Sequence, residues 1–374
     1  MFKTAIKFIL YDKPKSLGAL AGIIISIFLV GQQAGIFLFL TDAMKSLVAN
    51  NNQYIWVVDS KTDNGNQLSA LDMRVGRQIA SLPGVERVHP VVIVAGAAKF
   101  ENGKSSGLTL IGSEAPDFVG GPWNLFTAKR TDMLPEGAVV TEFFDSKTLG
   151  GLQPGDYFEI NGQKVYNAGL TKGVRGFGAA SYAFTTIERA RSLSSFSKDK
   201  ASLFLVKWKP GADKRQVINS INASISNIRA WDADEFAAAT VTTVLRTNGI
   251  AASFGSLIAF AIVAGFIIIG LTLYSSAIDR IKDYGTLKAI GATNGYITRL
   301  ILTQAFILAV VGFVIGRGMV EGFRQGIASA GTIFHFPMWL QYAFFFLTLF
   351  IALGGCLFAI RRINSLEPAQ VFRG

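Results

Sequence analysis

Residues 275–308, SSAIDRIKDYGTLKAIGATNGYITRLILTQAFIL, contain a short polar segment between two long apolar stretches. The centre of this segment can form a short amphipathic helix, with Leu287 and Ile290 on one side and Lys288 on another. Gly291 can end that helix, because glycine adopts left-handed backbone angles readily. We therefore expect the chain to leave a membrane, turn through a short helix and enter the membrane again. Such a helix suits docking into another protein, and the same composition also fits a helix that only lies in the membrane interface.

The composition of the chain indicates a membrane protein. Of its 374 residues, 50% are hydrophobic and 16% are charged, which is too apolar for a soluble protein of this size. The net charge of +11 fits the accumulation of Lys and Arg in cytoplasmic loops, so we expect no nucleic-acid partner. Cys356 is the single cysteine, and His89 and His335 lie far apart, so neither a disulfide framework nor a zinc site is expected.

Four segments are apolar and long enough, at about 20 residues or more, to cross a hydrocarbon core of about 30 Å. They are residues 17–40, 251–277, 300–320 and 339–360. The first segment is longer than the core of a signal peptide and lacks a small-residue cleavage site, so we expect it to remain as an anchor in the bilayer.

Positive charge sets the expected orientation of these spans. Lys and Arg gather in residues 1–16, an expected amphipathic N-terminal helix, in the hairpin 279–298, and in the tail 361–374. We therefore expect both termini and the hairpin on the cytoplasmic side of the membrane. Residues 321–338 would then form a short outer loop.

Residues 41–249 form a large insertion between the first two spans and are predicted to be a mixed α/β domain. Patterns typical of strands occur at 54–60, 87–100, 108–114, 156–170 and 201–208. Helical periodicity occurs at 71–82, 185–193 and 213–228, and residues 232–239 would lead into the second span. About 200 residues can bury their own core, and we expect two subdomains with one inserted into the other.

The sequence gives no sign of catalysis. The G-x-x-x-x-G-K-[ST] order that holds a phosphate is absent, and so is a dinucleotide-binding G-x-G-x-x-G. The glycine-rich stretch 169–181 is interpreted as a flexible turn between strands. Four acidic candidates have the spacing of ordinary solvated strand and turn residues; they are Glu142, Asp145, Asp156 and Glu159. We expect no catalytic residue, no metal and no cofactor on this chain.

Small and polar residues interrupt the first span at GQQAG, residues 31–35. Gly31 and Gly35 have the spacing that lets another helix approach closely. Gln32 and Gln33 place amide groups in hydrocarbon, where such groups seek hydrogen-bond partners. We predict that these four residues form a transmembrane seam, either with a second copy of the chain or along a substrate path. The alternative is a single hydrogen bond between helices that only holds the fold.

Three stretches resemble the MacB/FtsX-type permeases of ABC transporters, the type VII class. Residues 279–305, DRIKDYGTLKAIGATNGYITRLILTQA, are similar to the coupling signature of the family, and residues 361–374, RRINSLEPAQVFRG, are similar to its closing motif. Residues 134–171 look like part of its outer domain, and the first span resembles that of the glycolipid-exporting DevC branch. Gln304 departs from the family pattern, in which a glutamate is frequent.

The resemblance implies an α-helical membrane protein with four transmembrane helices and a mixed α/β extracytoplasmic domain between the first and second. It also implies a subunit of the bacterial inner membrane that pairs with a second copy of itself and sits on two ABC-type ATPase subunits, which would bind ATP and Mg²⁺. A coupling helix would contact those ATPase subunits. Its residues in this chain are Asp283, Tyr284, Gly285, Thr286, Leu287, Lys288, Ala289, Ile290, Gly291, Ala292 and Thr293.

The function implied by the resemblance is ATP-driven export of a hydrophobic or amphipathic molecule, such as a glycolipid, drug, haem or lipopeptide. A periplasmic membrane-fusion adaptor and an outer-membrane channel would be further partners. The alternative is a signalling lever like the FtsX proteins, which activates a periplasmic cell-wall hydrolase without transport. An outer domain near 200 residues favours the exporter. A gene for an adaptor or for a wall hydrolase beside that of the chain would separate the two.

Overall fold

The computed structural model describes residues 1–11, 13–178 and 181–364. The chain divides into two compact units. The helical unit comprises Met1–Phe39 and Ile250–Gly374, and the inserted domain comprises Leu40–Gly249. Most of the closing motif that we identified, residues 365–374, lies outside the described residues.

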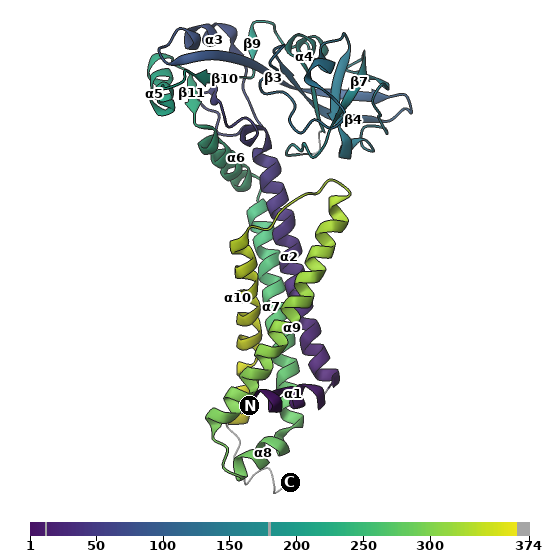
Figure 1. The fold of residues 1–374 in the computed structure, drawn as a ribbon, viewed down its shortest axis with the longest axis vertical. Coiled ribbons are helices and arrows are strands. Elements are labelled where there is room, and N and C mark those ends of the chain that lie inside the picture. Colours follow the sequence, from purple (N-terminus) through teal and green to yellow (C-terminus); the bar gives the residue numbers. More distant parts are fainter. Residues whose placement is uncertain (12, 179–180, 365–374) are drawn as a thin grey trace. The chain divides into compact units, whose positions relative to one another are not determined.

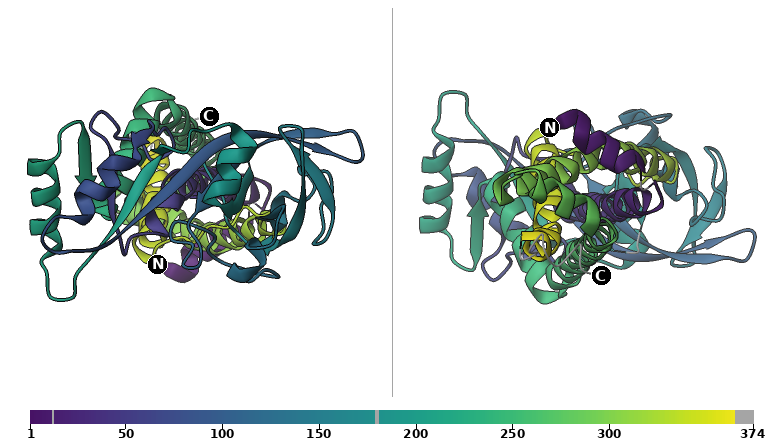
Figure 2. Two further views of the ribbon diagram at one scale, coloured as in Figure 1. Left: turned by 90° about the horizontal axis from the view of Figure 1, so that it is seen from above. Right: turned by 90° about the horizontal axis from the view of Figure 1, so that it is seen from below.

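Within the described residues, four helical segments are long and apolar enough to cross a membrane, which confirms the expected number of spans. They are α2 (Lys13–Ala49), α7 (Ile250–Asp279), α9 (Asn294–Ala328) and the pair α10 (Met338–Gly355) and α11 (Leu357–Asn364) (Figure 1). The described part of this unit also contains the short helices α1 (Phe2–Tyr11) and α8 (Ile281–Ala289). In the view from below, α1 in purple lies across one end of the helical unit, where it packs against α9 (Figure 2).

The third span is longer than the sequence suggested. We expected an outer loop over 321–338, but α9 continues to Ala328. Glu321 explains the extension, because its carboxylate lies 3.4 Å from Arg317 Nη1 and accepts a 3.0 Å hydrogen bond from Arg324 Nε. Arg317 and Arg324 lie about one helical turn before and after Glu321. Opposite charges at this spacing stabilise a helix. The prediction of a loop is therefore wrong for residues 321–328.

Small residues allow the spans to pack closely. A Cβ atom added at Gly22 of α2 would lie 2.4 Å from Ile268 Cγ2 of α7, and one at Gly312 of α9 would lie 2.5 Å from Ile23 Cγ2 of α2. Ser26 Oγ also donates a 2.6 Å hydrogen bond to the carbonyl of Ala261. Close backbone approach and a buried hydroxyl donor are the usual means of joining helices where no hydrophobic effect drives them together.

The inserted domain is built on a nine-stranded sheet in the order β11-β1-β10-β3-β4-β8-β5-β7-β6. Its principal strands are β1 (Ile55–Asp59), β3 (Val85–Phe100), β4 (Ser105–Ser113), β5 (Ala138–Glu142), β6 (Tyr157–Ile160), β7 (Gln163–Thr171), β8 (Ser181–Thr186), β10 (Leu203–Trp208) and β11 (Ile228–Trp231). The short strands β2 (Leu71–Asp72) and β9 (Lys200–Ala201) form a separate two-stranded sheet. The described helices of the inserted domain are α3 (Met73–Ala80), α4 (Ile187–Ser194), α5 (Lys214–Ser224) and α6 (Ala233–Thr247). It also contains the 3₁₀ turns η1 (Arg130–Met133) and η2 (Phe143–Asp145).

The long strand β3 joins two lobes of this domain. Its first half pairs with β10, and its second half pairs with β4 and, at the end, with β6. The pairing of β3 with β6 closes six strands into a ring lobe, whose interior holds one hydrophobic cluster. The remaining strands, with α3 and α5, form an open lobe around a second cluster. The two lobes share strand β3, and a third buried cluster, which includes Trp56 of β1, Ile111 of β4 and Phe184 of β8, contains residues of both.

Several elements differ from the sequence expectation. The stretch 156–170 is a hairpin of β6 and β7, because Asn161 and Gly162 take positive φ angles of 51° and 80° at a tight turn. Helix α5 ends at Ser224, so the helix predicted to 228 is too long. The expected short lead at 232–239 is the full helix α6.

Candidate functional site

Helix α8 lies between α7 and α9 and is ended by glycine, as the sequence predicts. Gly291 has a φ of 101°, and the N–H of Ala292 donates to the carbonyl of Leu287 at 2.9 Å. This six-to-one hydrogen bond is the usual stop of a helix on a left-handed residue. Thr293 then caps the next helix, since its hydroxyl accepts from the N–H of Tyr296 at 3.2 Å. Local hydrogen bonds thus specify the end of α8 and the start of α9.

One face of α8 is buried inside the helical unit. Tyr284 is 3% exposed, its ring centroid lies 5.7 Å from that of Phe8 on α1, and its side chain hydrogen bonds to Gln304 on α9. Burial raises the pKa of Tyr284, so its hydroxyl stays protonated. Gly285 is buried beside it. These two predicted coupling residues face inward and connect α8 to the spans.

Leu287 and Ile290 do not share one face, so that part of the prediction is wrong. Leu287 packs against the buried cluster that contains Tyr284, whereas the side chain of Ile290 is 76% exposed. The reason is that α8 begins earlier than expected, at Ile281. The side of the helix that faces inward is therefore the one that carries Tyr284, and Ile290 lies outside it.

Lys288 and Arg280 tie α8 to its surroundings. The Nζ of Lys288 donates to the carbonyls of Ile363 at 3.0 Å and Asn364 at 3.3 Å, the last residues of α11. A cation at this position satisfies carbonyls that a helix leaves free at its end. Arg280, which is 7% exposed, lies 4.8 Å from the ring of Phe8 on α1. The segment 280–288 thus contacts α1, α9 and α11.

The outward face of α8 and its stop is a small exposed surface, which we call the α8 face. It is formed by Lys282, Asp283, Thr286, Ala289, Ile290, Gly291 and Thr293. Ile290 is a single large apolar side chain surrounded by polar and small groups. Of the predicted coupling residues, Leu287, Lys288 and Ala292 are half-buried at its edge.

The predicted seam residues contact their own chain. A Cβ atom at Gly31 would lie 2.5 Å from Val320 Cγ2 of α9, and one at Gly35 would lie 2.4 Å from the ring of Phe334. Gln32 and Gln33 are half-buried. The close approach at the two glycines is thus made within one chain, and a seam with a second copy or a substrate stays a prediction.

Two of the four acidic candidates are buried, so their interpretation as solvated residues is wrong. Glu142 is fully buried and accepts hydrogen bonds from the N–H groups of Gly173 at 2.7 Å and Val174 at 3.0 Å. The carboxylate of Asp145 pairs with Arg175 at 3.0 Å. These carboxylates hold the loop after β7 in place, which is a structural role. Sequence spacing could not reveal it, because the partners lie on a distant segment.

Comparison with known proteins identifies the parts of the chain. Residues 16–224 match the model of the MacB-like periplasmic core domain, and residues 255–368 match that of the FtsX-like permease C-terminal region. An uncharacterized ABC transporter permease of Mycobacterium tuberculosis is 27% identical over 140 residues, which are 36% of this chain and 38% of the relative. The uncharacterized ABC transporter permease YknZ of Bacillus subtilis is 24% identical over 227 residues, 58% of this chain and 53% of the relative. The matches thus span about half or less of the length of these relatives.

Two of the solved structures that match part of the chain are extracytoplasmic regions. The extracellular domain of YknZ has a TM-score of 0.35 and 14% identity, covering 47% of this chain and 98% of that domain. The periplasmic region of MacB from Actinobacillus actinomycetemcomitans has a TM-score of 0.37 and 9% identity, covering 54% of this chain and 98% of that region. Since one family model alone matches more than half of the chain, the protein belongs to the MacB/FtsX-type permeases of ABC transporters.

Proposed function

We propose that the protein is the membrane subunit of an ATP-driven exporter, and that a separate ATPase subunit docks on the α8 face. Movement of the docked subunit would displace α8, the spans would carry the displacement, and the inserted domain would respond outside the membrane. The cargo would be a hydrophobic or amphipathic molecule. ATP and Mg²⁺ would be bound by the partner, and two copies of the chain would assemble with two copies of the ATPase subunit.

The division of α8 into two faces is the observation that carries this proposal. A helix that only anchored a loop would need an inward face, and α8 has one in Tyr284. It also keeps Ile290, at its C-terminal end, 76% exposed. A single exposed apolar side chain among polar groups is suited to insertion into a groove of a partner protein.

The inward contacts of α8 supply the path for transmission. Tyr284 reaches α1 and α9, and Lys288 reaches the end of α11. Packed interiors move as connected bodies rather than deforming continuously. A load applied to α8 would therefore reach three helical elements of the unit at once.

Substitution of Ile290 by aspartate tests the proposal. We expect the variant to fold normally, because the side chain is exposed, and to lose stimulation of the ATPase subunit in the reconstituted complex. Burying an unpaired carboxylate in a docking groove costs several kcal/mol, which corresponds to a loss of binding of about a hundredfold or more. Ile290→Leu is the matched control and should retain stimulation.

The same variant distinguishes export from signalling. If the protein exports, cells with Ile290→Asp should retain the cargo molecule and divide normally. Defects in cell separation with unchanged efflux would favour the signalling lever instead. Full ATPase stimulation by Ile290→Asp would exclude the α8 face as the docking surface.

A further inference from the structure

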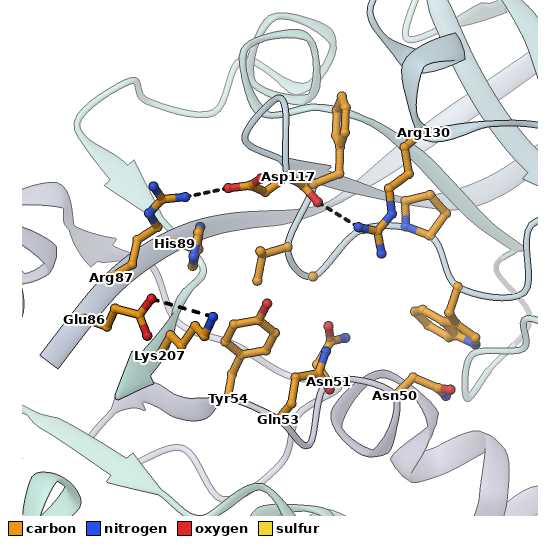
Figure 3. Close-up of a pocket in the computed structure, with 16 residues that line it drawn as sticks. Asn50, Asn51, Gln53, Tyr54, Glu86, Arg87, His89, Asp117, Arg130 and Lys207 are labelled. Atoms are coloured by element: carbon orange, nitrogen blue, oxygen red, sulfur yellow. Dashed lines mark hydrogen bonds and ion pairs between the residues drawn. The ribbon is translucent and has the colours of Figure 1, made fainter. Parts of the chain in front are cut away.

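The inserted domain contains a polar pocket of about 390 Å³ at the junction of its two lobes (Figure 3). Residues of β3, β10 and the link between α2 and β1 form one side of it, and the loop after β4 forms the other. This volume lies within the range of about 300–1,000 Å³ that small-molecule sites occupy. Such sites are mostly apolar, whereas this one is lined chiefly by charged and amide side chains.

The loop that covers the pocket is fixed rather than adaptable. Phe118 has a φ of 47° although it is a bulky residue, and its side chain is only 2% exposed. Such backbone conformations cost about 1–3 kcal/mol and persist where the surroundings enforce them. Gly120 has a φ of 78°, and a Cβ atom there would lie 2.7 Å from Val91 Cγ2. The loop therefore presents a rigid wall with a defined shape.

The charges around the opening do not balance. Asp117 Oδ2 pairs with Arg87 at 2.7 Å, and Glu86 lies 3.7 Å from the ammonium of Lys207. Arg130 Nη1 donates to the backbone carbonyl of Asp117 at 3.1 Å. Among the described residues, Arg130 has no carboxylate partner. The opening thus carries one positive charge that no side chain neutralises.

The floor of the pocket is polar and uncharged. His89 is 7% exposed, and its ring meets that of Tyr54 edge to face with centroids 5.9 Å apart. The described part of the chain gives the His89 ring no hydrogen-bond partner. Burial, and then the charge of Arg87, hold the pKa of His89 below its ordinary value, so the ring is neutral at pH 7. Figure 3 shows Tyr54 and Arg130 pointing into the opening from opposite sides.

We propose that this pocket binds an anionic group, a carboxylate or phosphate on a small polar molecule or on a lipid headgroup, with Arg130 pairing with its charge. A planar guanidinium offers two parallel donors to either kind of anion. Tyr54 and His89 supply the further hydrogen bonds from the floor. The site lies wholly within the inserted domain and does not depend on the exporter function proposed above.

Binding at this site is coupled to the protonation of His89. The charged groups facing the ring are Arg87 and Lys207, which oppose its protonation, and Asp117, which favours it. A bound anion adds negative charge and raises the pKa of His89. By reciprocity, the anion binds more tightly as the pH falls through the pKa of His89.

Calorimetric titration of the full chain in an uncharged detergent tests the proposal. Inorganic phosphate represents a free anion, and dihexanoyl phosphatidic acid represents a headgroup. We call whichever of these two probes binds the parent chain the effective probe. Arg130→Gln should weaken its binding by about tenfold or more, since a hydrogen bond to a charged group contributes about 1.5–3 kcal/mol. Arg77→Gln, an exposed arginine on α3, removes the same charge and should have no effect.

His89 supplies an independent readout. The chain has 2 histidines, so His335→Gln leaves His89 as a single imidazole signal in an NMR titration. The effective probe should raise the pKa of that signal in the His335→Gln chain and not when Arg130→Gln is added. Binding of phosphate would identify the ligand as a free anion, and binding of the lipid probe alone would identify it as a lipid headgroup. If neither probe moves the His89 signal, or if Arg130→Gln binds as tightly as the parent, the proposal is wrong.

Discussion

Helix α8 and the loop after β7 are both short, glycine-containing connections, yet different kinds of contact hold them. The stop of α8 rests on hydrogen bonds among neighbours in the chain, such as Ala292 to Leu287. Residues 172–178 of the loop are held by Glu142, which lies on another strand. The helix keeps an exposed face, whereas the loop, which we expected to be a flexible turn, is pinned from inside. The end of α8 is thus specified by neighbours in the chain, whereas the conformation of the loop depends on distant residues.

The largest expected effect is at the loop. Glu142→Ala removes the acceptor of the buried N–H group of Val174 and of the half-buried N–H group of Gly173. Since each orphaned buried donor costs about 1–3 kcal/mol, we expect the free energy of unfolding to fall by about 3–5 kcal/mol. Thermal unfolding of the purified chain, followed by near-ultraviolet circular dichroism, measures this. Glu159→Ala, an exposed carboxylate on β6, should change the stability by no more than about 0.5 kcal/mol.

A smaller effect is expected at the stop of α8. Gly291→Ala places a Cβ atom on a residue with a φ of 101°, which costs about 1–2 kcal/mol. Amide hydrogen exchange at Ile290, Gly291 and Ala292 should speed up by about tenfold. Gly295→Ala, four residues later in the first turn of α9, should slow exchange or leave it unchanged, because alanine favours a helix. Equal acceleration in both variants would show that the stop does not depend on the left-handed residue.

The smallest effect is expected where the extension of α2 meets the loop. Ser46 Oγ donates to the carbonyl of Arg175 at 2.6 Å, and its side chain also hydrogen bonds to Tyr182. Ser46→Ala should cost about 1 kcal/mol and loosen residues 172–178 in hydrogen exchange, with α8 unchanged. Ser105→Ala, on the exposed start of β4, is the control. If residues 172–178 of Ser46→Ala exchange their amide hydrogens as slowly as in the parent, the bond from Ser46 does not contribute to holding the loop.

Local patterns predicted the local features of the molecule. The four spans, the α/β character of the insertion and the stop at Gly291 follow from hydropathy, periodicity and one glycine. The burial of Tyr284 and the bond from Lys288 to Ile363 did not follow, because Lys288 and Ile363 lie 75 positions apart. The pocket was missed for the same reason. Its charged residues come from β3, β10, the loop after β4 and the 3₁₀ turn η1, and no single segment of the sequence shows their combination.

Cross-linking at position 290 tests most directly whether the α8 face meets an ATPase subunit. Cys356 is fully buried, so Ile290→Cys provides the accessible thiol in the described part of the chain. With a thiol-to-amine reagent and the co-purified ATPase subunit, we expect a cross-linked product from Ile290→Cys and none from Lys147→Cys on the surface of the inserted domain. An intact complex that cross-links through residue 147 and not through residue 290 would contradict the docking of the ATPase on α8.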